Sequence, residues 1–254
     1  MGLIDLQGRV ALVTGGSRGI GAAAAVLFAR AGARVALTYR SRWEDAQRVV
    51  QSLGDDASAV ALEADLGRRE DCERVVRETV EAFGRLDCFV ANAGVWPPGN
   101  VPVAELDDAR WRQTLSVNLD GVFFGTRAAL RVMGEGGRVV MVSSTASQRG
   151  EAFHADYAAS KGALNAFVKS VAVEVAPRIT VNAVAPGWVD TEMSELPYSR
   201  DGGAGRLAIE ATIPMKRVAT AEEVAGPIVF LCSDLAAHVT GEILNVNGGS
   251  VLCG

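Results

Sequence analysis

Tyr157 and Lys161 are the two residues of this sequence whose types and spacing point most directly to chemistry. Residues four positions apart lie on one face of an α-helix, so a phenol and an ammonium group would project side by side. A free tyrosine has a pKa of about 10, and a nearby cation favours the phenolate and lowers that pKa. The pair is therefore a candidate proton donor and acceptor for a carbonyl–alcohol reaction. The same spacing also occurs on solvated helices, so the surrounding elements have to support this interpretation.

A glycine-rich segment near the amino terminus predicts a nucleotide-binding turn. Residues 9–14 indicate a buried strand, and the alanine-rich residues 22–31 indicate a helix that ends at Gly32. Backbone N–H groups of the turn between them, and the positive end of the helix, are suited to a diphosphate. The glycine spacing is G-x3-G-x-G, and the expected binding residues are Gly15, Ser17, Arg18, Gly19, Ile20 and Gly21.

Strand-like and helix-like segments alternate along the rest of the chain. Further strands are expected near 34–39, 57–62, 86–91, 137–143, 179–184 and 242–246, and helices near 43–53, 68–83, 105–131, 155–176 and 220–232. This alternation predicts an α/β fold, with a doubly wound parallel sheet covered by helices on both faces. We expect a single Rossmann-fold domain over residues 1–254. Ligands of such sheets bind beyond the carboxyl ends of the strands, where residues 92–94, 143–144 and 186–187 fall.

Many of these motifs occur together in one known family. The matching positions are Thr14, Gly15, Gly19, Ile20, Gly21, Asp65, Ala91, Asn92, Ala93, Gly94, Asn118, Ser144, Tyr157, Lys161, 181–187, 240–242 and 247–249. In order and spacing they resemble the classical short-chain dehydrogenase/reductase family over nearly the whole chain. Ala91 stands where the family often has asparagine. Within the family the motifs and residues 213–217 are most similar to bacterial 3-oxoacyl-[acyl-carrier-protein] reductases.

The resemblance implies a role for each candidate catalytic residue. Tyr157 would be the proton donor in reduction, and Lys161 would lower the pKa of Tyr157 and hold the nicotinamide ribose. Ser144 would hydrogen-bond the substrate oxygen, with its neighbour Ser143 as the rival for this role. Asn118 would anchor a water leading to Lys161, and it could equally brace an irregularity in its helix.

The charge after the second strand indicates the cofactor. Enzymes that prefer NAD usually carry an acid there, which binds the adenosine ribose 2′-hydroxyl. This sequence has Arg40, Ser41 and Arg42 at that place, and its first acid is Glu44. Arginine binds a 2′-phosphate bidentately, so these residues together with Arg18 favour NADP(H) over NAD(H). The alternative is a solvated arginine cluster.

The remaining cofactor contacts are implied by the resemblance. Asp65 would contact the adenine ring, and Thr191 and the backbone of Val189 would contact the nicotinamide carboxamide. The other expected cofactor residues are Leu66, Asn92, Ala93, Gly94, Tyr157, Lys161, Pro186 and Gly187.

The expected substrate is a small-molecule carbonyl or alcohol, and a 3-oxoacyl thioester or a similar ketone is favoured. The segment 188–215 mixes apolar residues and glycines and predicts a substrate lid, and Trp96 is a candidate second wall. An NADP-dependent alcohol, sugar or polyketide/aromatic ketone dehydrogenase remains open, as does a nucleotide-sensing scaffold. Basic residues that would dock an acidic carrier protein are missing from the segment 134–137, although Arg131 and Arg138 flank it and Arg178 could still serve that docking.

Composition limits the partners. The chain has 254 residues, 49% hydrophobic residues and a net charge of −5, which favours neither nucleic acid nor an anionic membrane. No apolar run spans a membrane, the first residues lack a signal-peptide core, and the four cysteines suggest reduced thiols, so we expect a cytoplasmic protein. No metal site is expected. The segments 105–131 and 155–176 are apolar on more than one face, which predicts a homo-oligomer, and the resemblance implies a tetramer.

Overall fold

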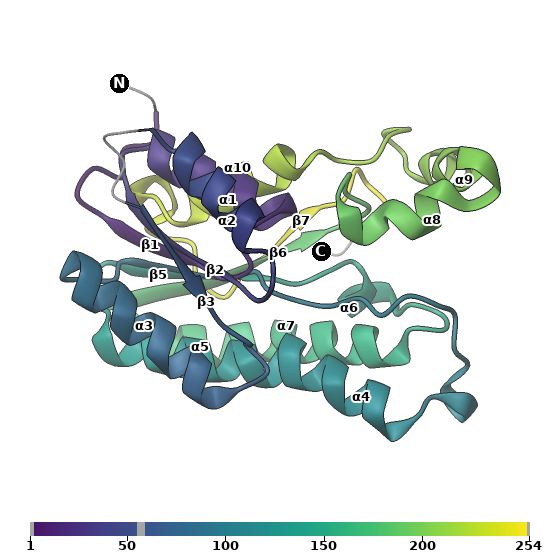
Figure 1. Cartoon of the computed structure of the whole chain (residues 1–254), viewed down its shortest axis with the longest axis horizontal. Coiled ribbons are helices and arrows are strands. Elements are labelled where there is room, and N and C mark those ends of the chain that lie inside the picture. Colours follow the sequence, from purple (N-terminus) through teal and green to yellow (C-terminus); the bar gives the residue numbers. More distant parts are fainter. Residues whose placement is uncertain (1–2, 55–58, 253–254) are drawn as a thin grey trace.

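The computed structural model describes residues 3–54 and 59–252, and they form one parallel sheet of seven strands (Figure 1). The order across the sheet is β3-β2-β1-β4-β5-β6-β7, and every pair of neighbouring strands is parallel. The strands are β1 Val10–Val13, β2 Arg34–Tyr39, β3 Ala59–Glu63, β4 Cys88–Ala91, β5 Gly137–Val142, β6 Ile179–Pro186 and β7 Ile243–Val246. The predicted doubly wound α/β fold is confirmed.

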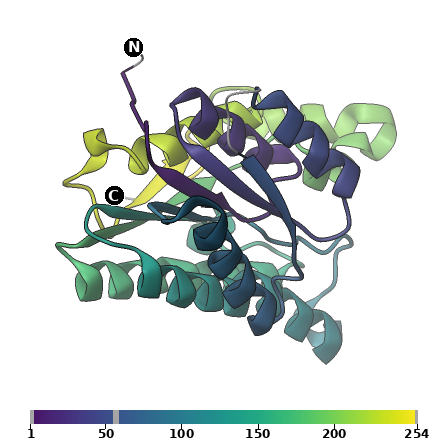
Figure 2. The ribbon, with the colours of Figure 1, turned by 60° about the vertical axis from the view of Figure 1, so that its left-hand side comes forward.

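Two layers of helices cover the sheet, as the two views in Figures 1 and 2 show. One layer contains α1 Gly19–Arg30, α2 Trp43–Ser52 and α10 Ala221–Leu231. The other layer contains α3 Arg69–Phe83, α5 Gly121–Val132 and α7 Ala155–Val175, with α4 Asp108–Leu115 at its edge. The short helix α6 Ala146–Arg149 lies between β5 and α7.

Alternate residues of the strands build the two cores. Ala11 and Val13 of β1 pack in the core under α1 and α10, whereas Val10 and Leu12 pack in the core over α3, α5 and α7. All four side chains are fully buried. Burial on both faces requires a continuous apolar strand rather than an alternating one, which is why residues 9–14 contain an unbroken run of apolar residues.

The strand order reverses between β1 and β4, and this reversal positions the site. The chain winds from β1 to β2 and β3 in one direction and from β4 to β7 in the other. The connections after β1 and β4 therefore diverge onto opposite faces and leave a crevice at the carboxyl edge. Residues 14–21 and 92–95 border that crevice.

Two predicted elements differ from the structure. The helix expected over 105–131 is divided into α4, a π-helical turn Ser116–Asp120 and α5. The segment expected as a lid contains helices α8 Glu195–Ser199 and α9 Ala204–Thr212, with 3₁₀ turns Glu192–Ser194 and Arg200–Gly203. Of the strand expected over 57–62, residues 57 and 58 lie outside the described residues.

The described residues also show the state of the cysteines and the lengths of the helices. Cys72, Cys88 and Cys232 are buried free thiols, and Cys253 lies outside the described residues. None of the described helices combines the length and apolarity needed to cross a membrane.

A substitution at Gly21, in the first turn of α1, tests how closely this helix approaches the glycine turn. A Cβ at this position would lie 2.2 Å from the backbone oxygen of Gly15. Because backbone cannot yield as a flexible side chain does, Gly21→Ala should lower the free energy of unfolding by about 1–3 kcal/mol. Chemical denaturation measures the change.

Gly226→Ala is the matched control, because it is also a helical glycine and its added Cβ would meet nothing within 4 Å. It should be neutral or stabilise by up to about 1 kcal/mol, since alanine is the better helix former. Equal stability changes in the two variants would contradict the close approach.

Candidate active site

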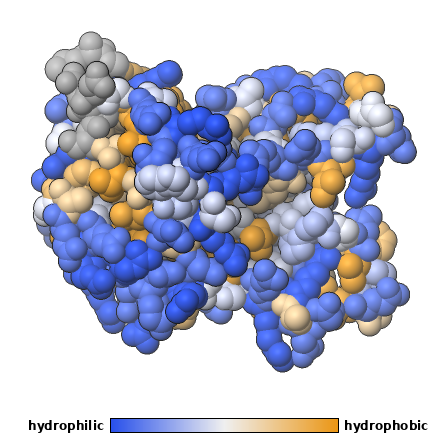
Figure 3. Space-filling model, in the orientation of Figure 1, coloured by the Kyte–Doolittle hydropathy of each residue, from blue (hydrophilic) through white to orange (hydrophobic). Residues whose placement is uncertain are grey.

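A cavity of about 450 Å³ opens at the carboxyl edge of the sheet and collects nearly all of the sequence-predicted site residues. Its volume is in the range of small-molecule and cofactor sites. The predicted residues that line it are Gly15, Ser17, Arg18, Gly19, Ile20, Arg40, Ser41, Asp65, Leu66, Asn92, Ala93, Gly94, Ser144, Tyr157, Lys161, Pro186, Gly187, Val189 and Thr191. Figure 3 shows the surface hollowed between the lid helices and the α4 side of the molecule.

Gly21 and Asn118 are the two predicted site residues that do not line this cavity. Gly21 instead allows α1 to pack against Gly15. Further lining residues come from strand ends and connections that the sequence did not indicate, and they are Thr38, Tyr39, Ala64, Val95, Val117 and Val142. Arg42 of the expected arginine cluster and Glu192, Met193 and Ser194 of the expected lid line the cavity as well.

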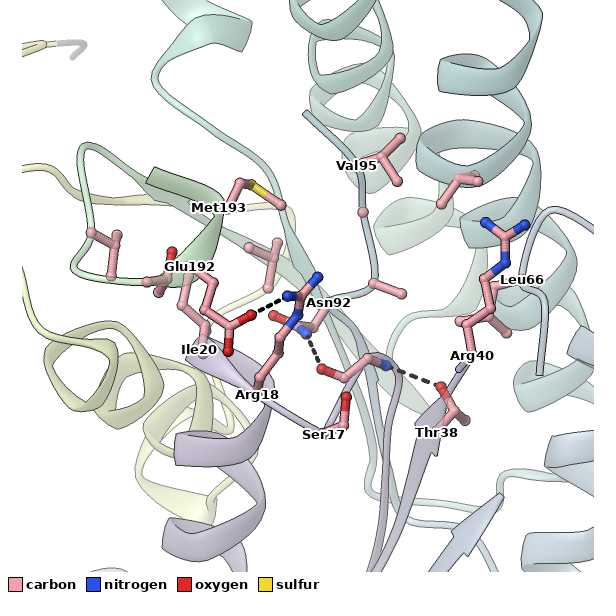
Figure 4. A pocket seen from close by; sticks show the side chains of 18 of the residues that line it. Ser17, Arg18, Ile20, Thr38, Arg40, Leu66, Asn92, Val95, Glu192 and Met193 are labelled. Atoms are coloured by element: carbon pink, nitrogen blue, oxygen red, sulfur yellow. Dashed lines mark hydrogen bonds and ion pairs between the residues drawn. The ribbon is translucent and has the colours of Figure 1, made fainter. Parts of the chain in front are cut away.

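Hydrogen bonds between the ends of β1, β2 and β4 hold the glycine turn (Figure 4). The backbone N–H of Gly15 donates to Oγ1 of Thr38 at 3.0 Å. The Nδ2 group of Asn92 donates to the backbone oxygens of Thr14 at 2.8 Å and Gly15 at 3.2 Å. Gly15 and Gly19 both have positive φ, of 65° and 54°, which side chains other than glycine rarely adopt. The turn therefore presents its backbone to the cavity.

Tyr157 and Lys161 lie one turn apart at the start of α7, and the ammonium Nζ is 5.9 Å from the centroid of the phenol ring. Lys161 is 4% exposed, and its Nζ donates to the backbone oxygen of Val142 at 2.8 Å. Burial lowers the pKa of Lys161 to about 8. The side chain still carries a proton at neutral pH.

The lowered pKa that we expected for Tyr157 is not found. Burial raises the pKa of Tyr157 to about 12, a hydrogen bond with Ser144 acts against this, and the carboxylate of Glu151 raises it further. The desolvation of the phenolate is thus the largest effect, and the Nζ of Lys161 is directed to a backbone oxygen. At neutral pH Tyr157 is a protonated phenol, which suits a proton donor.

The two neighbouring serines differ in their environments. The Oγ of Ser143 is buried and donates to Oδ1 of Asn165 at 2.8 Å, so it belongs to the packing between β5 and α7. Ser144 is partly exposed, hydrogen-bonds Tyr157 and accepts from the backbone N–H of Ala146 at 3.1 Å. Both serines line the cavity, but of the two only Ser144 hydrogen-bonds Tyr157.

Asn118 is fully buried in the π-helical turn and braces the segment after β4. Its Oδ1 accepts from the backbone N–H of Val95 at 2.8 Å, and its Nδ2 donates to the backbone oxygen of Val95 at 2.9 Å. A Cβ on Gly94 would lie 3.3 Å from Oδ1 of Asn118 and 3.4 Å from Nζ of Lys161. Asn118 and Lys161 therefore approach the same point of the backbone.

Acidic side chains accompany the arginines at the other end of the cavity. Arg40 pairs with Asp65 at 3.3 Å, and Glu192 of the lid pairs with both Arg18 and Arg42. The sequence after β2 suggested arginines without a carboxylate. This interpretation was incomplete, because Asp45 also pairs with Arg42 at 3.1 Å and a chain segment far away in the sequence supplies Glu192. Within the described residues, no group of three or more His, Cys, Asp or Glu could hold a metal ion.

Comparisons with known proteins agree with this arrangement. The family described as "Enoyl-(Acyl carrier protein) reductase" matches residues 15–250. The chain is 36% identical to a 3-oxoacyl-[acyl-carrier-protein] reductase of Synechocystis over 97% of this chain and 98% of the relative. It is 39% identical to versicolorin reductase 1 of Aspergillus parasiticus, over 96% and 97% of the two chains.

A solved short chain dehydrogenase from Burkholderia cenocepacia J2315, in complex with NADP, superposes with a TM-score of 0.90. It is 37% identical, and the match covers 96% of this chain and 98% of that one. The chain belongs to the short-chain dehydrogenase/reductase family. It is an oxidoreductase of that family, similar to the 3-oxoacyl-[acyl-carrier-protein] reductases.

An aromatic cluster of this short-chain dehydrogenase/reductase lies around the residues that precede Tyr157. Trp96 stacks on His154 with ring centroids 4.4 Å apart, and its Nε1 donates to Oε1 of Glu151 at 3.0 Å. Trp188 at the base of the lid meets the edge of Trp96 at 6.5 Å. The cluster joins three segments that are distant in sequence, next to the segment that carries Tyr157.

A buried ion pair fixes the start of α7, and sequence reasoning missed it. Asp156 is 0% exposed and accepts from Oγ1 of Thr114 at 2.8 Å and from Nε of Arg110 at 3.2 Å. Burial raises the pKa of Asp156, but the hydrogen bonds from Arg110 and Thr114 outweigh burial and hold it below its usual value. The pair ties α4 to the residue that precedes Tyr157.

Asp156→Asn should destabilise this oxidoreductase in a pH-dependent way. A folded-state pKa below the unfolded value of about 4 gives stability that is present above that pH and lost in more acidic solution. We expect the variant to lose about 2–3 kcal/mol of unfolding free energy at pH 7, and the loss should shrink below about pH 4. Denaturant titrations across this pH range measure it.

Asp108→Asn is the matched control, because Asp108 is an exposed carboxylate paired with Arg112 on α4 itself. Surface pairs of this kind contribute little, so the control should change stability by less than about 1 kcal/mol. A loss in Asp156→Asn that stayed constant down to acidic pH would contradict the role of the ionised carboxylate.

Proposed function

We propose that the protein is an NADPH-dependent carbonyl reductase in which Tyr157 donates the proton. One observation carries the proposal: Tyr157, Ser144 and Lys161 share one cavity with the glycine turn and with the arginines beside it. The first proposed substrate is a 3-oxoacyl thioester or a similar ketone. The proposal includes one domain over residues 1–254, with the segment 188–215 as substrate lid.

The residues present fit a dinucleotide. The turn after β1 offers backbone N–H groups to a phosphate. Its glycines leave room that a side chain would take: a Cβ on Gly15 would come within 3.0 Å of Cα of Ala93. The residues around Gly15, Arg40 and Asp65 would hold the adenosine diphosphate half. Lys161, Val189 and Thr191 would hold the nicotinamide half. When bound, NADPH supplies the hydride.

The side chains of the chain itself supply the proton and orient the carbonyl. Tyr157 is protonated at neutral pH, so its hydroxyl can donate to the carbonyl oxygen of a bound substrate. Ser144 hydrogen-bonds Tyr157 and would donate to the same oxygen. Lys161 would stabilise the phenolate that remains after the proton has left and then pass a proton to it, and Asn118 would anchor a water that returns a proton to Lys161.

The choice of NADPH rests on the arginines. Arg18, Arg40 and Arg42 all line the cavity at the carboxyl ends of β1 and β2. Guanidinium groups bind phosphate bidentately and are poor partners for an unmodified ribose hydroxyl. The Burkholderia structure similar to this chain contains NADP.

An aromatic ketone is the second candidate substrate, and the aromatic cluster favours it. Trp96 and Trp188 are partly exposed and offer ring surface on which a planar ring system could pack, and the buried His154 supports Trp96 from behind. A relative of this chain is named versicolorin reductase. NADPH oxidation assays with β-ketoacyl thioesters, diketones, quinones, aromatic ketones and sugars distinguish the candidates from each other. A nucleotide-sensing scaffold would bind NADPH and turn over none of them.

Tyr157→Phe tests the proton donor. The variant keeps the ring and its packing but loses the hydroxyl, so kcat should fall by about 10²–10⁴-fold with NADPH affinity nearly unchanged. Steady-state kinetics on the best ketone of the panel and a fluorescence titration with NADPH measure both quantities.

Tyr39→Phe is the matched control, because it removes a phenol hydroxyl from the adenosine end of the same cavity. It should retain most of the turnover. A Tyr157→Phe enzyme with kcat close to that of the wild type would refute the assigned role.

We also propose a homo-oligomer, a tetramer, assembled through α5 and α7, and a cytoplasmic location for a protein with buried reduced thiols. Many apolar residues of the two helices, such as Leu164 and Val168, are buried in the chain's own core. Phe123 is 39% exposed, packs against Phe124 and Phe167, and has the guanidinium of Arg127 4.9 Å from its ring centroid.

Phe123→Asp should dissociate the oligomer into smaller species, because a carboxylate at this position would be buried in the interface without a partner. Light scattering at micromolar concentration should give a multiple of 26.6 kDa for the wild type and a smaller mass for the variant. Leu207→Asp, an equally drastic change at an exposed position of the lid, should keep the wild-type mass. A wild-type mass of a single chain would rule out the oligomer.

A further inference from the structure

Glu192 of the lid pairs with two arginines across the cavity, with Arg18, as Figure 4 shows, and with Arg42. Its Oε2 accepts from Nη1 of Arg18 and lies 3.0 Å from Nη2 of Arg42. Arg18 belongs to the glycine turn, and Arg42 is the residue that precedes α2. One carboxylate oxygen is thus held between guanidinium groups from two different connections of the sheet.

Two guanidinium groups that converge on one oxygen form an anion site. Arg18 and Arg42 both line the cavity, and so does Glu192, whose carboxylate fills the point of convergence. Planar guanidinium groups bind phosphate oxygens in the same way as carboxylate oxygens. A phosphate group that reached this point would compete with Glu192 for the same donors.

We propose that Glu192 is a specificity-determining residue, because its carboxylate occupies the anion site between Arg18 and Arg42 and the 2′-phosphate of NADPH has to displace it. The inference rests on the proposed NADPH-dependent function. A ribose with a free 2′-hydroxyl carries no charge to compete with, so NADH leaves the ion pairs in place. Glu192 therefore lowers the preference of the site for NADPH over NADH without contact with the reacting atoms.

The side chain of Glu192 can leave the two arginines while the rest of the lid keeps its structure. Val189 and Ala219 form a β-bridge, and the N–H of Asp190 donates to the oxygen of Ala219 at 2.8 Å, which joins the two ends of the lid. Tyr198, Ile213 and Val218 form a small core of the lid itself. Glu192 lies in the first turn after the joined end, and its side chain is 45% exposed, so it can rotate away.

Binding of nucleotide fragments tests the inference without reference to catalysis. Titration calorimetry would compare adenosine 2′,5′-bisphosphate with adenosine 5′-diphosphate on the wild type and on Glu192→Gln. The variant should bind the 2′-phosphorylated fragment about three- to ten-fold more tightly, since two exposed ion pairs no longer compete. Its affinity for the 5′-diphosphate should stay unchanged.

Two further variants make the test specific. Glu195→Gln removes the same charge three residues further along the lid, and Glu195 has no ion-pair partner among residues 3–54 and 59–252. This control should bind both fragments as the wild type does. In the double variant Glu192→Gln/Arg42→Ala, the gain in affinity should disappear, because one of the two phosphate donors is gone.

A result that contradicts the role of Glu192 can be distinguished from one that contradicts the proposed function. If Glu192→Gln behaves as Glu195→Gln does, or binds both fragments more tightly by the same factor, the role of Glu192 is overturned while the proposed function stands. If neither the wild type nor Glu192→Gln binds the 2′-phosphorylated fragment more tightly than the 5′-diphosphate, the arginines do not recognise a 2′-phosphate, and the NADPH proposal is overturned together with the inference. Thermal unfolding midpoints close to that of the wild type confirm that the variants are folded.

Discussion

The site depends on the close approach of helix α1 to the end of strand β1. A Cβ on Gly21 would lie 2.2 Å from the oxygen of Gly15 and 2.6 Å from Nδ2 of Asn92, so only glycine lets these backbones meet. Asn92 then connects the end of β4 to the same turn through two hydrogen bonds. Because β1 and β4 border the reversal of strand order, this contact sets the width of the crevice.

A second constraint is the burial of ionisable groups at the other end of the cavity. Desolvation raises the pKa of Tyr157 to about 12 and lowers that of Lys161 to about 8. Buried polar groups are stable only with partners, and the structure provides them. The ammonium of Lys161 donates to Val142, and the carboxylate of Asp156 is held by Arg110 and Thr114. The acid is thus kept protonated and in a fixed position before any ligand binds.

Much of this architecture could be predicted from local patterns. The glycine turn, the apolar strands and the spacing of Tyr157 and Lys161 are each set within a few residues, and the parallel sheet follows from their alternation. The positions that line the cavity could be named from family motifs. The break between α4 and α5 was harder, because the bonds of Asn118 to Val95 cross from one segment to another.

Contacts between distant segments had no sequence signal. Arg18 and Glu192 are 174 positions apart in the sequence. Their ion pair therefore could not be predicted from the residues that follow β2. Asp156 and Arg110 likewise belong to different helices, and the sequence around one of them gives no indication that the other is its partner. The pKa of Tyr157 was predicted with the wrong sign because the spacing of two residues gives their proximity but not their burial.

Isotope transfer from the cofactor tests the central claim, carbonyl reduction in this cavity, most directly. The enzyme would be incubated with NADPH carrying deuterium at C4 of the nicotinamide, together with the ketone that it turns over fastest. We expect an alcohol with deuterium on the former carbonyl carbon and in a single configuration, because Ser144 and Tyr157 would hold the substrate in one orientation. A protein that binds NADPH and transfers no deuterium to any ketone of the panel would contradict it.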